Sequence, residues 1–209
     1  MEIIAISISV HYDDILRHVL DQNSRFLKKW IIVTTPEDEK TISLIKNSGK
    51  ENIQLLLYPD FYSRGVKFNK GGAIKYAQDF IDANYTNANI LLLDSDIYLP
   101  DNFREQLPKS LEEHTLYGVS ERLDYWTLED FNNNTNPHKY GTAAHFLFVG
   151  YFQLYKQSKD YKYSNSYNCS VCDDLFRNKF PNRIVLDMTV KHLGKKIVNW
   201  NGRSSKSNF

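Results

Sequence analysis

The feature that most limits the fold of this chain is an alternation of apolar runs and helical stretches over its first hundred residues. Short runs rich in apolar and β-branched residues predict buried strands at residues 3–10, 30–34, 53–58 and 90–93. Apolar side chains at helical spacing predict helices between them, at residues 13–26, 35–47 and 69–84. Because parallel strands need long crossover connections, this order predicts an α/β fold with a mostly parallel central sheet and helices on both faces.

The second half of the chain has a less regular rhythm. It predicts helices at residues 102–113 and 173–180, and strands at residues 116–119, 145–155, 184–186 and 197–198. Residues 123–140 are polar and rich in asparagine, and they predict an irregular connection. No internal repeat or linker-like segment interrupts the sequence, so residues 1–209 are expected to form a single domain.

Composition argues against several classes of protein. A formal net charge of +1 disfavours a basic surface for nucleic acid. No apolar run is long enough for a transmembrane segment, and the start lacks the pattern of a signal peptide, so a cytoplasmic location is expected. Aromatic residues make up 14% of the chain, which suits either a sugar-binding surface or an ordinary core. Cys169 and Cys172 lack a second pair of ligands at zinc-site spacing, and free thiols are expected there.

Two aspartates follow the last apolar run of the first half. Asp94 and Asp96 come directly after three leucines that indicate a central buried strand. In an extended chain, residues two apart point to the same side, so the two carboxylates are expected to converge on one ligand at the carboxyl end of the strand. Adjacent carboxylates need a counter-ion, and a divalent metal such as magnesium or manganese suits their oxygens. Such a metal would neutralise a diphosphate leaving group. The alternative is a pair of surface aspartates in a turn.

At this point the chain resembles the GT-A fold glycosyltransferases, close to glycosyltransferase family 2 and to its small bacterial and large-DNA-virus members. The resemblance covers almost the whole chain and implies a Rossmann-like donor half at about residues 1–100 and an acceptor half at about residues 101–209. The segments that carry it are residues 30–38 (WIIVTTPED), 67–73 (KFNKGGA), 93–100 (LDSDIYLP), 149–154 (VGYFQL), 172–176 (CDDLF), 192–194 (HLG) and 199–203 (NWNGR).

The resemblance implies a metal-dependent site for a nucleotide-sugar. It implies that Asp96 and His192 bind the metal, and an imidazole ligand would favour manganese over magnesium. It implies donor contacts near the ribose, the base pocket and the diphosphate, made by Tyr12, Thr34, Asn69, Lys70, Asp94, Ser95 and Arg203. A lysine at the start of a helix is suited to phosphate, although Lys70 could also be a solvated surface lysine.

The resemblance also implies inversion by a single displacement, which needs a general base on the acceptor hydroxyl. Asp173 matches the family's aspartate, and its neighbour Asp174 competes for the role. Both are expected at a helix start, where they could also form a plain acidic cap. Cys172 stands where the family usually has a small hydroxyl residue.

The nucleotide is expected to be UDP, with dTDP and GDP as alternatives, and the acceptor to be a glycan or another hydroxyl compound. A sugar nucleotidyltransferase is a rival, but it should carry a glycine-rich loop after the first strand, and residues 10–14 (VHYDD) contain no glycine. A non-catalytic module that binds a nucleotide-sugar or a glycan stays open as a second rival.

Overall fold

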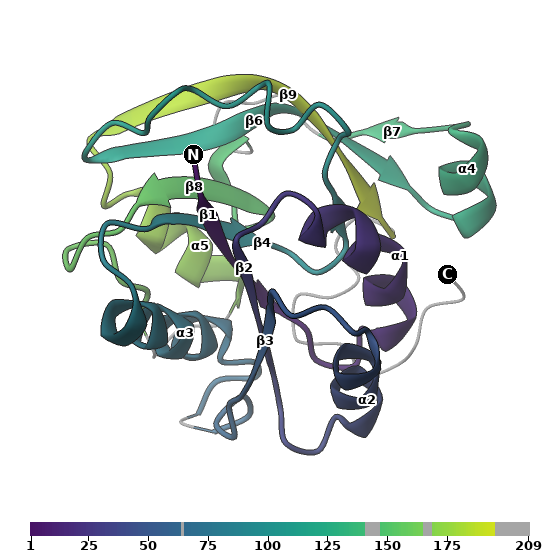
Figure 1. The fold of residues 1–209 in the computed structure, drawn as a ribbon, viewed down its shortest axis with the longest axis horizontal. Coiled ribbons are helices and arrows are strands. Elements are labelled where there is room, and N and C mark those ends of the chain that lie inside the picture. The colour runs from purple at the N-terminus through teal and green to yellow at the C-terminus, as the bar shows by residue number, and fades with distance from the viewer. Residues whose placement is uncertain (64, 141–146, 165–168, 195–209) are drawn as a thin grey trace.

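The computed structural model describes residues 1–63, 65–140, 147–164 and 169–194 (Figure 1). Within these residues, one nine-stranded sheet runs in the order β3-β2-β1-β4-β8-β6-β9-β5, and β7 pairs with β6 off this path. The central strand β4 joins strands from the first half of the chain to strands from the second half.

The first half forms a parallel sheet, as its alternation predicts. The strands β1 (Ile3–Ile8), β2 (Lys29–Thr34), β3 (Ile53–Leu57) and β4 (Asn89–Leu93) pair in parallel in the order β3-β2-β1-β4. The helices that connect them are α1 (Asp13–Ser24), α2 (Glu39–Asn47) and α3 (Lys70–Asn84). The predicted start of the second helix was too early, because Asp38 rather than Thr35 caps α2 by accepting a hydrogen bond from the amide of Thr41.

Two layers of core cover opposite faces of these strands. One layer joins Ala5, Trp30 and Leu91 to the apolar face of α1, and the other joins Ile6 and Ile31 to α3 and α5. Figure 1 accordingly shows α1 and α2 on one side of the sheet, and α3 and α5 on the other. Since alternate strand residues point to opposite faces, continuous apolar strands are what a sheet covered on both sides requires. The predicted α/β class, with helices on both faces, is confirmed.

The second half extends this sheet with mixed pairing. Its elements are β5 (Ile97–Tyr98), β6 (Thr115–Tyr125), α4 (Leu128–Asn133), β7 (His138–Lys139), β8 (Phe152–Lys156), α5 (Cys169–Arg177) and β9 (Asn182–Leu193). Strand β8 runs antiparallel to β4, while β9 runs parallel to β6 and antiparallel to β5. The mostly parallel order predicted for the sheet therefore describes its first half, and the second half is mixed.

Several element boundaries in the second half differ from the prediction. The helix predicted at residues 102–113 is replaced by turns over residues 101–106, where Gln22 anchors the carbonyl of Leu99 and the side chain of Asp101. Pro108, which has no amide hydrogen to donate, also interrupts a helix there. Residues 123–140 are not irregular: they contain the end of β6, all of α4 and β7. Residues 184–186 belong to the long strand β9. The strand predicted at residues 145–155 is shorter: residues 145–146 fall outside the described residues, residues 147–151 form turns, and β8 begins only at Phe152. The strand predicted at residues 197–198 falls outside the described residues.

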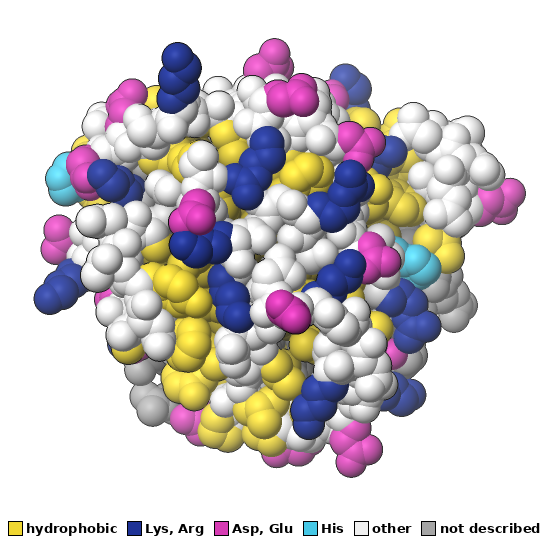
Figure 2. All heavy atoms as spheres, in the orientation of Figure 1, with side chains coloured by type: hydrophobic (Ala, Val, Ile, Leu, Met, Phe, Trp, Pro, Cys, Tyr) yellow, Lys and Arg dark blue, Asp and Glu magenta, His cyan; other side chains and the backbone are white. Residues whose placement is uncertain are grey.

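The described residues contain no helix with the length and apolar character that a membrane span needs. On the face seen in Figure 2, basic and acidic side chains lie among one another, with apolar side chains exposed between them.

Asp38 ties the carboxyl ends of β1 and β2 together, so its removal is expected to destabilise the fold. Its carboxylate accepts hydrogen bonds from the amides of His11 (2.6 Å) and Thr41 (3.2 Å) and from the hydroxyl of Thr34 (3.0 Å). Burial tends to raise the pKa of Asp38, but these hydrogen bonds outweigh it and lower the pKa below its usual value. We expect Asp38→Ala to lower the free energy of unfolding by about 2 kcal/mol at neutral pH, the upper end for loss of a helix cap.

The pH dependence of this loss has a definite sign. Because the pKa is lower in the folded state, the contribution of Asp38 is complete above the unfolded value of about 4 and fades as the pH falls through the folded value. Urea unfolding at neutral and acidic pH should show the difference between wild type and Asp38→Ala narrowing at acidic pH. The exposed Asp21→Ala is the control, and a difference that widens towards acidic pH would contradict this account.

Candidate active site

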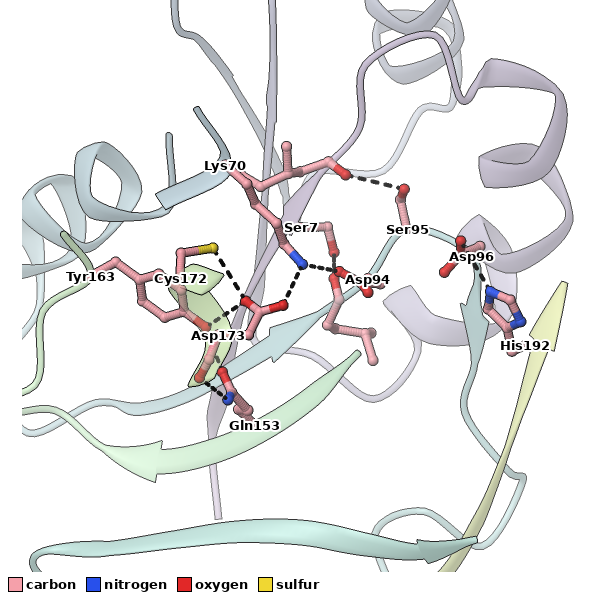
Figure 3. Close-up of polar contacts among 12 residues, drawn as sticks. Ser7, Lys70, Asp94, Ser95, Asp96, Gln153, Tyr163, Cys172, Asp173 and His192 are labelled. Carbon is pink, nitrogen blue, oxygen red and sulfur yellow. Dashed lines mark hydrogen bonds and ion pairs between the residues drawn. The ribbon is translucent and has the colours of Figure 1, made fainter. Parts of the chain in front are cut away.

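The segment after β4 is held against the end of β1 by two serine hydroxyls. Ser7 donates to the carbonyl of Leu93 (2.5 Å), and Ser95 donates to the carbonyl of Ile8 (3.2 Å) (Figure 3). Ser95 is 2% exposed. These bonds position the backbone from which the two aspartates project.

Lys70 brings the two halves of the chain together at this point. Its Nζ atom donates to Asp94 Oδ1 (3.0 Å) and to Asp173 Oδ2 (3.3 Å), and only 12% of its side chain is exposed (Figure 3). Lys70 is the first residue of α3, where the buried Asn69 caps the helix by accepting from the amide of Gly72 (3.0 Å). The predicted site residues Lys70, Asp94 and Asp173 therefore lie in one cluster, although Asp173 is 103 residues from Lys70 in sequence.

Asp94 is both surrounded by protein and open to a ligand. Burial, the largest cause, raises its pKa to about 6; Asp96 and Asp173 add to the rise and Lys70 opposes it. Although protein atoms surround it on most sides, the side chain of Asp94 keeps 35% of its surface exposed to solvent. A carboxylate in this setting can accept hydrogen bonds from a polar ligand while Lys70 compensates its charge.

Asp96 faces a different partner from Asp94. The segment after β4 is a turn, with the amide of Ile97 donating to the carbonyl of Asp94 (3.2 Å), so the expected extended geometry does not hold. The Asp96 carboxylate instead lies next to the imidazole of His192 on β9, with Oδ2 3.4 Å from Nε2 (Figure 3). The pairing of β5 with β9, which sets Ile97 opposite His192, brings them together.

His192 lies between two carboxylates, one of which the sequence analysis missed. Its Nδ1 atom lies 3.2 Å from Asp124 Oδ1, and Arg122 holds Asp124 through two hydrogen bonds of 2.8 and 3.1 Å. Burial alone would lower the pKa of His192, but Asp96 and then Asp124 outweigh it and raise the pKa to about 9. The pKa of Asp96 is lowered: burial tends to raise it, and His192 more than offsets this. Arg122 and Asp124 are two residues apart, a spacing that places both side chains on one face of a strand. This spacing was the signal in the sequence that could have identified them as partners.

The pair of Asp96 and His192 fits a divalent cation in part. Among the described residues, no group of three or more His, Cys, Asp or Glu side chains is arranged to hold a metal ion. Asp96 Oδ1 is nevertheless buried, and it has no hydrogen-bond partner in the part of the chain that the structure describes. A metal binds only the neutral imidazole, so a cation here would displace the proton that the raised pKa of His192 keeps on the ring. The carboxylate oxygen and the imidazole nitrogen would then offer two protein ligands, and metals in phosphate sites often have only one or two carboxylates plus substrate oxygens.

The two candidate bases, Asp173 and Asp174, point in different directions. The Asp173 carboxylate lies in the Lys70 cluster and is 16% exposed, whereas that of Asp174 is 50% exposed and pairs with Arg177 (3.0 Å). The expected position at a helix start is wrong, because α5 begins at Cys169 and has no acidic residue in its first turn. The helix macrodipole therefore does not stabilise these two carboxylates as expected. The position of Asp173 beside Lys70 makes it a better candidate for the general base than Asp174.

Three further residues were predicted to bind the donor, namely Tyr12, Thr34 and Arg203. Tyr12 precedes α1 and packs partly buried against the core. Thr34 is fully buried at the end of β2, and its hydroxyl donates to Asp38 (3.0 Å). Arg203 lies outside the described residues. The roles of Tyr12, Thr34 and Arg203 in donor binding stay predictions.

A scan against models of protein families finds no family that matches this chain, and a search of curated proteins finds no match. Solved structures that overlap with it include the 4-diphosphocytidyl-2C-methyl-D-erythritol synthase of Anaerococcus prevotii, at 12% identity and a TM-score of 0.49, with 89% of this chain and 87% of that chain covered. The glycosyltransferase GlyE of Streptococcus pneumoniae overlaps at 15% identity and a TM-score of 0.45, with 86% of this chain and 37% of that chain covered. The galactosyltransferase LgtC, solved with donor and acceptor sugar analogues, overlaps at 10% identity and a TM-score of 0.43, with 85% and 64% covered. At these identities and TM-scores the overlaps carry no argument about function, which is drawn below from the side chains of this protein.

Proposed function

We propose that this protein is a glycosyltransferase that moves a sugar from a nucleoside-diphosphate sugar to a hydroxyl group of a glycan or another acceptor. The observation that supports it most is the Lys70 ammonium between Asp94, at the carboxyl end of β4, and Asp173, on α5. Ligands of α/β sheets bind outside the carboxyl ends of the strands, so this cluster lies where a nucleotide-sugar is expected. Membership of glycosyltransferase family 2, and UDP as the nucleotide, stay predictions from the sequence motifs.

On the donor side, Asp94 is the side chain available to the ribose, because it is the most exposed carboxylate of the cluster. Lys70, the first residue of α3, offers a cation at the positive end of a helix, which suits a diphosphate. Asn69 and Ser95 act indirectly in this scheme, since their buried polar groups fix the start of α3 and the turn after β4. Tyr12 and Thr34 would border the base, and Arg203 would contact the diphosphate.

Asp96 and His192 would hold a divalent cation, manganese or magnesium. When bound, such a cation supplies positive charge that stabilises the diphosphate as it leaves. Asp124, held by Arg122, lies 3.2 Å from Nδ1 of His192, and its charge on that side of the ring would leave Nε2 turned towards Asp96. Carboxylates behind metal-bound histidines commonly act in this way.

The proposed reaction is a single displacement with inversion. Asp173 takes the proton of the acceptor hydroxyl as its O–H bond breaks, and the freed electron pair forms the new bond to the anomeric carbon of the sugar. The bond from that carbon to the diphosphate oxygen breaks at the same time, and its electron pair leaves with the diphosphate. Lys70 lies within hydrogen-bond distance of both Asp94 and Asp173, so it holds the base beside the carboxylate that would contact the donor.

Product analysis separates this proposal from its rivals. A glycosyltransferase given a nucleotide-sugar and manganese releases nucleoside diphosphate, with water as a slow acceptor, whereas a sugar nucleotidyltransferase given pyrophosphate forms nucleoside triphosphate. The loop after β1 has no glycine, and His11 within it has a φ of 60°, so it differs from a glycine-rich phosphate loop. We expect nucleoside diphosphate as the product; triphosphate would support the nucleotidyltransferase, and binding without any product would support a binding module.

Asp124→Asn is expected to weaken manganese binding by about 10- to 100-fold, because an outer carboxylate that orients a metal-bound histidine has been lost. Manganese affinity can be measured by electron paramagnetic resonance in the presence of UDP, independently of turnover. Glu121→Gln, on the same strand and paired with Lys139, is the control and should bind manganese as wild type does. Equal affinities of Asp124→Asn and Glu121→Gln would contradict a role for Asp124 behind the metal.

A further inference from the structure

A buried hydrogen-bonded pair, Tyr163 and Gln153, lies directly behind Asp173. Tyr163 follows β8 in sequence and is 2% exposed, while Gln153 lies on β8 and is fully buried. The hydroxyl of Tyr163 lies 3.0 Å from Asp173 Oδ1 and 2.6 Å from Gln153 Oε1 (Figure 3). A network of this kind is costly to bury unless its geometry is well satisfied.

Contacts with several neighbouring groups fix the orientation of Tyr163 and Gln153. Gln153 Nε2 donates to the carbonyl of Phe148 (2.8 Å), so its Oε1 atom is the end that faces Tyr163. The ring of Tyr163 stacks on Phe176 of α5, with centroids 4.2 Å apart, and its amide donates to Gln78 Oε1 (2.9 Å). The hydroxyl is thus held in place relative to α5, which carries Asp173.

The two oxygens of Asp173 consequently have different surroundings. Oδ1 accepts from Tyr163 and lies 3.6 Å from the buried thiol of Cys172, so it faces the interior. Oδ2 lies 3.3 Å from Lys70, whose ammonium also contacts the partly exposed Asp94. A carboxylate oxygen has two lone-pair sites, so the contact with Lys70 leaves Oδ2 a second site.

We propose that Tyr163 and Gln153 are positioning residues that anchor Asp173 Oδ1, so that Oδ2 is the oxygen that takes the proton of the acceptor hydroxyl. This inference rests on the proposed function of Asp173. Tyr163 has a single hydroxyl proton, which serves Oδ1 while Asp173 is ionised. Once Oδ2 has gained the acceptor's proton, the hydroxyl can turn to Gln153 Oε1, and it keeps an acceptor in both charge states.

The test compares two substitutions that each remove one buried hydroxyl. Tyr163→Phe keeps the ring and its stacking but removes the anchor of Oδ1. Tyr155→Phe is the matched control, because Tyr155 is fully buried and its hydroxyl accepts from Gln78 (2.7 Å) rather than contacting Asp173. Crystal structures of both variants report the position of the Asp173 carboxylate. Steady-state turnover and donor affinity are measured with whichever UDP-, dTDP- or GDP-sugar the wild type hydrolyses fastest with manganese.

We expect the Asp173 carboxylate to move by more than about 0.5 Å in Tyr163→Phe, beyond the tolerance of a catalytic group, and to stay in place in Tyr155→Phe. Turnover should fall by about 10- to 100-fold in Tyr163→Phe only, with donor affinity retained, because misplacing a catalytic group costs rate rather than binding. An unmoved carboxylate, or turnover equal to that of Tyr155→Phe, would overturn the inference. Wild-type turnover in Asp173→Asn would instead overturn the proposed function of Asp173, while the crystal structures would still decide whether Tyr163 positions it.

Discussion

Replacing Asp173 with asparagine is expected to lower the turnover of sugar transfer by about 10²- to 10⁴-fold, the contribution typical of a general base. Asparagine preserves the size of the side chain but cannot take up the proton of the acceptor hydroxyl. Lys70 keeps its hydrogen bond to Asp94 in this variant, so donor affinity is expected to change little. Steady-state kinetics at saturating donor, together with a titration of donor binding, separate the two effects.

The neighbouring Asp174→Asn is the matched control. Its side chain pairs with Arg177 and lies outside the cluster of Lys70, Asp94 and Asp173, so turnover close to that of wild type is expected. If Asp174→Asn lost turnover and Asp173→Asn did not, the base would have to be assigned to Asp174.

Gly150→Ala is expected to lower turnover by about 100-fold, because a displacement of about 1 Å in a catalytic constellation costs that much. A Cβ atom at residue 150 would lie 2.1 Å from Asp173 Oδ2 and 2.3 Å from its Cγ atom, closer than non-bonded atoms approach. The carboxylate would have to swing away from Lys70, or the turn before β8 would have to shift. Turnover of the variant, with urea unfolding to confirm that it is folded, measures this effect.

A double-mutant cycle shows whether the contact with Asp173 is the cause. Overpacking of this kind costs about 1–3 kcal/mol of stability, and removing the carboxylate should relieve most of it. Gly150→Ala is therefore expected to destabilise wild type more than it destabilises Asp173→Ala. Equal destabilisation in both backgrounds would mean that Gly150 is required for another reason.

The first half of the fold was predictable because its signals are local. Each strand is a short apolar run bounded by a helix, and the parallel direction of the strands follows from this alternation. In the second half, the polar residues Glu121, Arg122 and Asp124 lie within the long strand β6, where β9 provides their neighbours from about 70 residues away. Local propensity assigns such residues to a loop, since the partners that make them acceptable in a strand are invisible to it.

The residues of the candidate site also divide into those with a signal in the sequence and those whose role depends on distant packing. Asp94 and Asp96 stood out because two carboxylates follow an apolar strand, whereas Lys70, Asp173 and His192 were identified through the resemblance of their motifs to those of GT-A fold glycosyltransferases. Asp124, Tyr163 and Gln153 act through other side chains, and their contacts depend on how β6, β8 and α5 pack. The turn after β4 could not be predicted from the sequence either. It directs Asp94 towards Lys70 and Asp96 towards His192.

The most direct test of the central claim is the release of nucleoside diphosphate from a panel of UDP-, dTDP- and GDP-sugars, with manganese, magnesium or a chelator. Wild type is compared with Asp96→Ala and with the exposed control Asp21→Ala. We predict that one donor is hydrolysed only with metal, that Asp21→Ala behaves as wild type does, and that Asp96→Ala loses the activity. Hydrolysis that persists in the chelator and in Asp96→Ala, or the absence of donor binding, would contradict a metal-dependent glycosyl transfer at this site.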